Sequence, residues 1–239
     1  MCCNLQSLDR TVKCSQYAHN SSIQSEKIPC MMQTEYLLKY YNVMINKDFI
    51  LRFEGPFGLT KNKWPVLFEH PFAKESGLYL WAVPYIQGGY LVTYVGETGK
   101  TFGRRMKDHF IQTVGGNYRI CDPDLLVKGE TKVLWNGLWR KGTRDKLSEY
   151  LEKLEELAPI IQKGLQTEIV FLALIKSDRR LRQRIEGAIA GHIKSQAPPI
   201  LSVLPQDVRY YQRSADEEAV NVFIECSCNI HGLPRELVA

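Results

Sequence analysis

Four side chains that could act together on a phosphate ester lie within one short part of the chain, at Tyr79, Tyr94, Arg105 and His109. Arginine carries a permanent planar charge that matches phosphate oxygens, and histidine can donate to a phosphate or share a proton relay. A phenol normally titrates near ~10, so a tyrosine acts as a base only where a nearby guanidinium or metal favours the phenolate. These residue types suit cleavage of a phosphodiester, which needs a nucleophilic water, charge stabilisation and help for the leaving oxygen.

A hairpin is the element that would bring the two phenols together. Residues 78–86 and 90–95 are rich in aromatic and β-branched side chains, as strands are, and Gln87-Gly88-Gly89 between them is a turn sequence. Because adjacent strands place their side chains side by side, Tyr79 and Tyr94 can share one site.

A helix opening at Thr101-Phe102 would carry the arginine and the histidine. Arg105 and His109 are four residues apart, so they lie on neighbouring positions of the helix surface. The spacing predicts a core-facing stripe made by Phe102, Met106, Phe110 and Thr113.

The segments that follow this helix read as a loop, a helix and a strand. Residues 115–143 are punctuated by glycines and read as a loop, which Trp135 and Trp139 could anchor. Residues 147–161 have the pattern of an amphipathic helix, broken near its end by Pro159. The apolar run at 168–175 predicts a central buried strand.

A second helix is expected at 179–195, capped by Ser177-Asp178 and stopped by Pro198-Pro199. Glu186 points off the apolar stripe of this helix, and several arginines crowd its first turns. One further strand is expected at 220–225.

The residues before the hairpin carry weaker patterns. Residues 1–31 are polar and aperiodic, which predicts a poorly ordered tail. A short helix is expected at 36–41 and an extended piece at 49–53. Gly55-Pro56 and Trp64-Pro65 predict turns, because the residue before a proline is disfavoured in helices.

The chain resembles the GIY-YIG nuclease domain. The two triplets of the family are matched by Gly77-Leu78-Tyr79 and Tyr94-Val95-Gly96, the helix with arginine and histidine by Arg105 and His109, and the later carboxylate by Glu186. The resemblance covers residues 77–201 and is interrupted at 115–161, which is longer than in a minimal family domain. It implies an α+β fold with a small, mainly antiparallel sheet flanked by helices.

The resemblance also implies a function, namely a metal-dependent endonuclease that hydrolyses DNA. Homing, repair and restriction roles stay open, and the restriction type is the preferred expectation because no separate DNA-binding module is visible after residue 205. Tyr79 would activate water with Tyr94 beside it, Arg105 and His109 would contact the phosphate, and Glu186 would bind Mg²⁺ or Mn²⁺. The residues expected to contact the DNA backbone are Lys100, Arg104, Lys107 and Arg182. An enzyme that cuts a palindrome would be a homodimer by symmetry.

Other functions stay open beside this one. Ser202 stands where many family members have an asparagine, which favours a catalytically inactive domain that binds nucleic acid. A nucleotide hydrolase is suggested by the P-loop-like sequence at 96–101, although the first glycine of that motif would fall on Tyr94. Cys226 and Cys228 with His231 match no zinc module. Taken singly, the tyrosines could be strand aromatics, and Glu186 could be a surface ion-pair partner of Arg182.

The composition sets broad limits. A net charge of +5 and a pI near 8.7 permit a polyanionic partner without requiring one. No apolar run approaches the ~18 residues of a membrane span, so we expect a cytoplasmic protein whose seven cysteines are free thiols. We expect a tail at 1–31, a lead-in at 32–76, a catalytic domain at 77–205 with an insertion at 115–161, and a C-terminal extension with a strand at 206–239.

Overall fold

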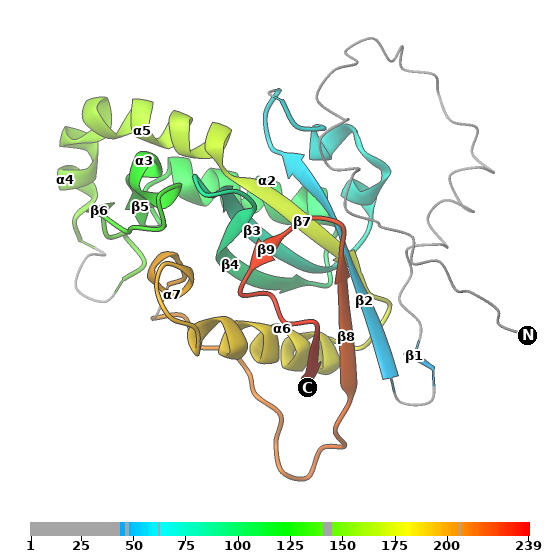
Figure 1. Ribbon diagram of the computed structural model, residues 1–239. Helices are drawn as coiled ribbons and strands as arrows, with labels where there is room; N and C mark the ends of the chain where they lie inside the picture. The colour runs from blue at the N-terminus through cyan, green and yellow to red at the C-terminus, as the bar shows by residue number, and fades with distance from the viewer. Residues whose placement is uncertain (1–43, 46–47, 62, 141–144, 206) are drawn as a thin grey trace, which may run out of the picture.

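The computed structural model describes residues 44–45, 48–61, 63–140, 145–205 and 207–239 (Figure 1). The tail expected at 1–31, the short helix expected at 36–41 and the first four cysteines lie outside the described residues. The three cysteines within them, Cys121, Cys226 and Cys228, are free thiols as expected. No helix in the described part of the chain is both long enough and apolar enough to cross a membrane.

One large mixed sheet forms the centre of the fold. Its strands are β1 (Met44–Ile45), β2 (Asp48–Gly58), β3 (Gly77–Pro84), β4 (Tyr90–Thr98), β7 (Ile169–Leu174), β8 (Asn221–Cys226), β9 (Ile230–His231) and β10 (Glu236–Val238). They lie in the order β10-β8-β2-β7-β3-β4-β9, with β1 beside β2. The pairs β2–β8 and β4–β9 are parallel and the others are antiparallel. The sheet is strongly curled, since β2 and β8 run steeply past β3 and β4 (Figure 1).

The expectation of a small, mainly antiparallel sheet is therefore wrong. The hairpin of β3 and β4 and the buried strand β7 are present as predicted, and every residue of β7 is buried. The sheet is larger than expected because β2 and the C-terminal strands are part of it. Residues 48–53 of β2 pair in parallel with residues 221–226 of β8. The turn expected at Gly55-Pro56 is also wrong, because both residues lie inside β2, with a cis peptide bond between them and a register shift between Glu54 and Phe57.

Two helices occupy the predicted positions beside the hairpin. Helix α2 (Phe102–Val114) is capped by Thr101, whose hydroxyl accepts from the Arg104 N–H, and α6 (Arg179–Lys194) is capped in the same way by Asp178. The stripe expected on α2 is only partly correct. Phe102 and Met106 are buried, but Phe110 is 41% exposed and His109 is buried in its place. The buried face of α2 thus includes His109, one of the catalytic candidates.

The insertion has more structure than the loop expected from its glycines. It contains β5 (Ile120–Cys121), α3 (Pro123–Leu126), β6 (Val133–Trp135), α4 (Leu147–Glu152) and α5 (Leu154–Thr167). The helix break lies at Lys153, whereas Pro159 is inside α5. Trp135 does anchor the segment, since its Nε1 donates to the Gly116 carbonyl at 2.7 Å, but Trp139 is 57% exposed.

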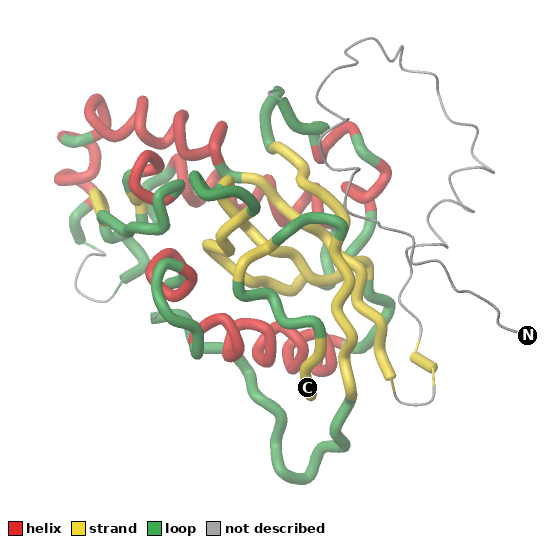
Figure 2. The backbone as a smooth tube through the Cα atoms, in the orientation of Figure 1, coloured by secondary structure: helices red, strands yellow, loops and turns green. Residues whose placement is uncertain are grey.

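Helices cover both faces of the sheet. Along β3 the side chains alternate, as in any strand: Leu78 and Leu80 pack in the core beneath α6, while Tyr79 and Trp81 pack with α2 and α5. Figures 1 and 2 show α6 on one side of β3 and β4 and the α2 and α5 helices on the other. Three short helical turns complete the described fold, η2 (Leu67–Glu69), η3 (Pro71–Lys74) and α7 (Ile200–Val203).

Two phenylalanines of α2 test which face of this helix is buried. Phe102 is fully buried, so Phe102→Ala should lower the free energy of unfolding by about 3–5 kcal/mol. Phe110→Ala should lower it by less than about 1 kcal/mol, because that ring is already partly in water. Urea unfolding of both variants measures the difference. Equal losses would mean that the helix is rotated from the orientation described.

Candidate active site

A hydrogen-bonded chain of three side chains lies at the centre of the candidate site. Arg105 Nε donates to the Tyr79 hydroxyl at 3.0 Å, and the same hydroxyl lies 2.9 Å from His109 Nε2. Tyr79 is fully buried on β3, while Arg105 and His109 reach it from α2. The two residues that the sequence placed four apart therefore meet one phenol.

Gly96 on β4 makes room for this phenol. Tyr79 and Gly96 are direct partners in the β3–β4 register. A Cβ at Gly96 would lie 2.2 Å from Cζ of Tyr79 and 2.4 Å from its hydroxyl, far inside van der Waals contact. The last glycine of Tyr94-Val95-Gly96 therefore has a local physical cause, because any larger residue would displace the Tyr79 ring.

Tyr94 stands beside this chain on the same face of the sheet. Its ring is stacked 6.1 Å from the Tyr79 ring and lies 5.8 Å from the His109 ring. The two strands thus bring the phenols together as the hairpin predicted. Tyr94 is only partly buried and lines an adjacent pocket, so a substrate could reach its hydroxyl.

Glu186 reaches the same site from α6, on the other side of the sheet. Strand β9 pairs with only Tyr90 and Leu91, near the start of β4. The N–H of Glu97, farther along β4, donates to Glu186 Oε1 at 3.0 Å. Burial is the main cause of the raised pKa of Tyr79 and of Tyr94, and the negative charge of Glu186 adds to both shifts.

Glu97 is a second carboxylate at this point, and the sequence motifs did not single it out. Its oxygens are bound by Arg182, whose Nε donates to Oε2 at 3.0 Å, and Arg179 lies 3.8 Å away. Burial first and the charge of Glu97 second raise the pKa of Glu186 to about 7. A cation beside Glu186 would offset both effects.

Burial also controls the ionisation of Tyr79, Tyr94 and His109. It raises the pKa of Tyr79 well above its usual range, against the opposing charge of Arg105. Burial and then the charge of Glu186 raise the pKa of Tyr94 to about 12. Burial and then the charge of Arg105 lower the pKa of His109 to about 3. At neutral pH the site therefore holds two neutral phenols and a neutral imidazole beside one guanidinium.

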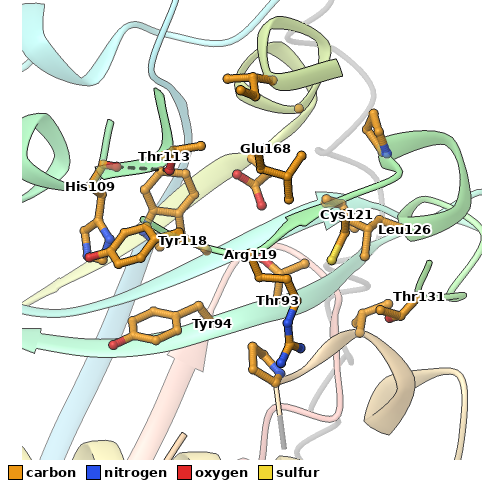
Figure 3. A pocket seen from close by; sticks show the side chains of 18 of the residues that line it. Thr93, Tyr94, His109, Thr113, Tyr118, Arg119, Cys121, Leu126, Thr131 and Glu168 are labelled. Atoms are coloured by element: carbon orange, nitrogen blue, oxygen red, sulfur yellow. Dashed lines mark hydrogen bonds between the residues drawn. The ribbon is translucent and has the colours of Figure 1, made fainter. Parts of the chain in front are cut away.

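A pocket of about 590 Å³ opens next to this cluster. Tyr94, Arg105 and His109 belong to its wall, together with residues of the insertion and of α7. Figure 3 shows His109, Tyr118 and Tyr94 at one end of the pocket and Cys121, Leu126 and Thr131 at the other. Ser202, where a family asparagine was expected, also lines it, and its carbonyl accepts from the Thr131 hydroxyl.

Tyr118 is a third tyrosine at the site that the sequence did not single out. Its ring lies 5.4 Å from the His109 ring and also 5.4 Å from the Trp139 ring. It belongs to the insertion, which read as a loop without a functional motif. Nothing in the local pattern pointed to it, because its position depends on how the insertion folds back over α2.

The four residues expected to contact DNA differ in their surroundings. Arg104 and Lys107 are exposed on α2, and Lys100 is exposed just before it, with its Nζ 3.5 Å from Asp108. Arg182 is only 8% exposed and is bound to Glu97 and to the Ser177 carbonyl. Its place is behind Glu97, so we leave Arg182 out of the DNA-contacting surface.

The donor set at Glu186 fits a hard cation that keeps most of its water. Among the described residues, no group of three or more His, Cys, Asp and Glu side chains could hold a metal ion. A single carboxylate with phosphate and water oxygens is nevertheless a common way to bind Mg²⁺. Glu186 Oε1 is engaged by the Glu97 N–H, which leaves Oε2 outside that bond.

Replacement of Gly96 tests the packing of the central phenol. Gly96→Ala should displace Tyr79, break its bonds to Arg105 and His109, and cost about 1–3 kcal/mol of unfolding free energy. The matched control is Gly164→Ala in α5, where no atom lies within 4 Å and the change should stabilise by about 0.5–1 kcal/mol. Denaturant titration reports both values. A Gly96→Ala protein as stable as its parent would contradict the packing.

Comparison of the chain with protein-family models, with curated proteins and with solved structures returned no match. No relative therefore supplies a function for this chain. The geometry brings Tyr79, Tyr94, Arg105 and His109 together from two strands and one helix. It also binds Glu186 of α6 to the N–H of Glu97, next to Gly96 on β4.

Proposed function

We propose that this protein is a metal-dependent endonuclease that hydrolyses phosphodiester bonds of DNA. The observation that carries the proposal is the hydrogen-bonded set of Arg105, Tyr79 and His109, together with the Glu186 carboxylate bound to the N–H of Glu97, one residue after Gly96. The resemblance of the motifs to those of GIY-YIG nucleases supports the same assignment. The basic surface at Lys100, Arg104 and Lys107 lies at the start of the helix that carries Arg105, where it suits a nucleic-acid backbone.

Arg105 has the geometry of a phosphate ligand. Its Nε is used by the Tyr79 hydroxyl, and the side chain is partly exposed and lines the pocket, where its charge would attract phosphate oxygens. The Tyr79 hydroxyl is thereby held at a fixed place beside the phosphate. This arrangement would position the reacting groups before the substrate arrives.

Tyr79 and His109 form a path for the proton of the attacking water. The Tyr79 oxygen would take the proton from water while the Tyr79 proton passes to His109 Nε2, 2.9 Å away. In the free protein, burial first and the charge of Arg105 second keep the pKa of His109 at about 3. A bound phosphate would neutralise part of that charge, so His109 would become a better acceptor in the complex.

Glu186 would hold the divalent cation, Mg²⁺ or Mn²⁺, through one carboxylate oxygen. The cation would supply positive charge beside the phosphate and favour ionisation of the neighbouring phenols. Arg182 and Glu97 support this carboxylate from behind, because Arg182 binds the Glu97 side chain while the Glu97 N–H binds Glu186.

A nucleotide hydrolase has less support. Gly96 and Thr98 belong to strand β4, and the space above Gly96 is filled by the Tyr79 ring. A phosphate-binding loop needs free backbone N–H groups around an anion. Here the N–H of Glu97 donates to Glu186 and that of Lys100 to the Thr98 hydroxyl.

The proposal is tested by incubating the protein with long duplex DNA and Mg²⁺ or Mn²⁺ and measuring single-turnover nicking. Tyr79→Phe, Arg105→Ala and Glu186→Gln should each lower the rate by about 100-fold or more, because each removes a group that acts on the reacting phosphate. Glu186→Gln keeps the acceptor for the Glu97 N–H, so its loss of rate is not a loss of folding.

Arg104→Ala is the matched control on the same helix. Arg104 is exposed and adjacent to Arg105, so its loss should weaken DNA binding while the rate at saturating DNA stays the same. A protein that shifts DNA but cuts it with neither metal would be an inactive nucleic-acid-binding domain. ATP turnover that depends on Lys100 would identify a nucleotide hydrolase instead.

A further inference from the structure

The pocket beside the catalytic cluster has unpaired polar atoms in its wall. Trp81 on β3 and Thr93 on β4 line it and are 6% and 8% exposed. Within the described part of the chain, neither Trp81 Nε1 nor Thr93 Oγ1 has a hydrogen-bond partner. Buried polar groups are nearly always paired, and an unpaired one costs free energy. Both residues belong to the pocket wall, so a ligand in the pocket would supply the missing partners.

The walls of the pocket suit a flat ligand with a polar edge. Tyr94 and Tyr118 stand at the end nearest His109 (Figure 3). The Trp139 ring lies 5.4 Å from the Tyr118 ring. Glu168 and Arg119 face the space between the two ends (Figure 3). Burial raises the pKa of Glu168 to about 7, so near neutral pH its carboxyl can either donate or accept a hydrogen bond.

The lining also includes apolar side chains, and the volume is that of a small-molecule site. Val83, Leu126 and Val203 contribute side chains that pack together at the far end. The volume of about 590 Å³ falls within the roughly 300–1,000 Å³ of typical ligand pockets. A single water would leave most of this space unfilled, whereas an aromatic ring with ring nitrogens and exocyclic groups would use both the apolar walls and the polar atoms.

We propose that this pocket receives one unstacked nucleobase of the bound strand. The inference rests on the proposed nuclease function, because Arg105 and His109 belong both to the catalytic cluster and to the pocket wall. A phosphate bound at Arg105 would bring its neighbouring base to the mouth of the pocket. Tyr118 and Trp139 would stack on the base, while Trp81 Nε1 and the Thr93 hydroxyl would bind its edge.

The pocket would select part of the substrate independently of the chemistry. Taking a base out of a duplex costs stacking and pairing energy, and this cost is smallest for mismatched or single-stranded bases. A nuclease with such a pocket therefore favours sites where a base is already loose or can be extruded. The polar atoms on the wall would distinguish among the four bases, since each base presents different donors and acceptors.

The first experiment measures binding of the four deoxynucleoside monophosphates to the full chain without a divalent metal, by calorimetry. We expect saturable binding of at least one of them. Trp81→Phe keeps the ring and removes the N–H, and Thr93→Val keeps the shape and removes the hydroxyl, so each should weaken binding by about threefold to tenfold. Trp139→Ala should weaken it by at least about fivefold through lost stacking.

Trp64→Phe is the matched control. Trp64 packs against Tyr90 at a ring distance of 6.1 Å and is not part of the pocket wall, so its variant should bind as the parent does. Absence of saturable binding at millimolar nucleotide would overturn the proposal and leave water as the occupant. Binding that Trp81→Phe and Thr93→Val both leave unchanged would overturn it as well.

A second experiment follows the base in DNA. A duplex carrying 2-aminopurine is bound in EDTA, so that no cleavage occurs, and extrusion of the base should raise its fluorescence. Thr93→Val should reduce this rise, and no rise at any labelled position would contradict the proposal. Cleavage without base extrusion and without nucleotide binding would contradict the proposed base pocket but support the proposed nuclease function. Nucleotide binding by a parent protein that does not cleave DNA would support the proposed base pocket and contradict the proposed nuclease function.

Discussion

The site depends on the placement of one buried phenol. Tyr79 occupies the space that Gly96 leaves on the paired strand, and there its hydroxyl meets Arg105 and His109. The hydrogen bonds alone would not fix the ring, because Arg105 is partly exposed and its side chain is long. The close contact with Gly96 does fix it. Strand register, the glycine and the helix that follows are thus parts of one constraint.

A second constraint explains how a carboxylate from a helix on the opposite side of the sheet reaches the backbone of β4. Helix α6 packs on the face of Leu78 and Leu80, away from the Tyr79 ring. It can still contribute Glu186 because β9 covers only the beginning of β4 and the N–H of Glu97 is taken by the carboxylate itself. A strand paired along its whole outer edge would have kept the two faces apart.

The sequence predicted the parts of the fold that local patterns determine. The β3–β4 hairpin, the buried strand β7, the capped helices α2 and α6 and the strand β8 all lie close to their predicted positions. Each carries its own signal, such as the glycine turn at 87–89, the Thr101 and Asp178 caps or the apolar run at 168–175. The five catalytic candidates lie on these elements, which is why the sequence could group them.

The sequence could not predict what depends on distant pairing. The parallel pairing of residues 48–53 with residues 221–226 makes the sheet large and mixed, and no local pattern records it. The surroundings of Arg182 and His109 also depend on contacts that no local sequence pattern records. Arg182 reads as a surface charge, but Glu97 on β4 binds it, and His109 lies in the buried stripe of α2 where Phe110 was expected. Tyr118 and the pocket depend on the folding of the insertion, which read as a loop.

The most direct test of the account is a crystal structure of the protein with Mn²⁺ and a duplex made uncleavable by phosphorothioate linkages. The account predicts an anomalous manganese peak at the Glu186 carboxylate, with a phosphate of the same strand bound by Arg105 beside the Tyr79 hydroxyl. Manganese at a different group, or DNA bound on a face that leaves these side chains in solvent, would contradict it.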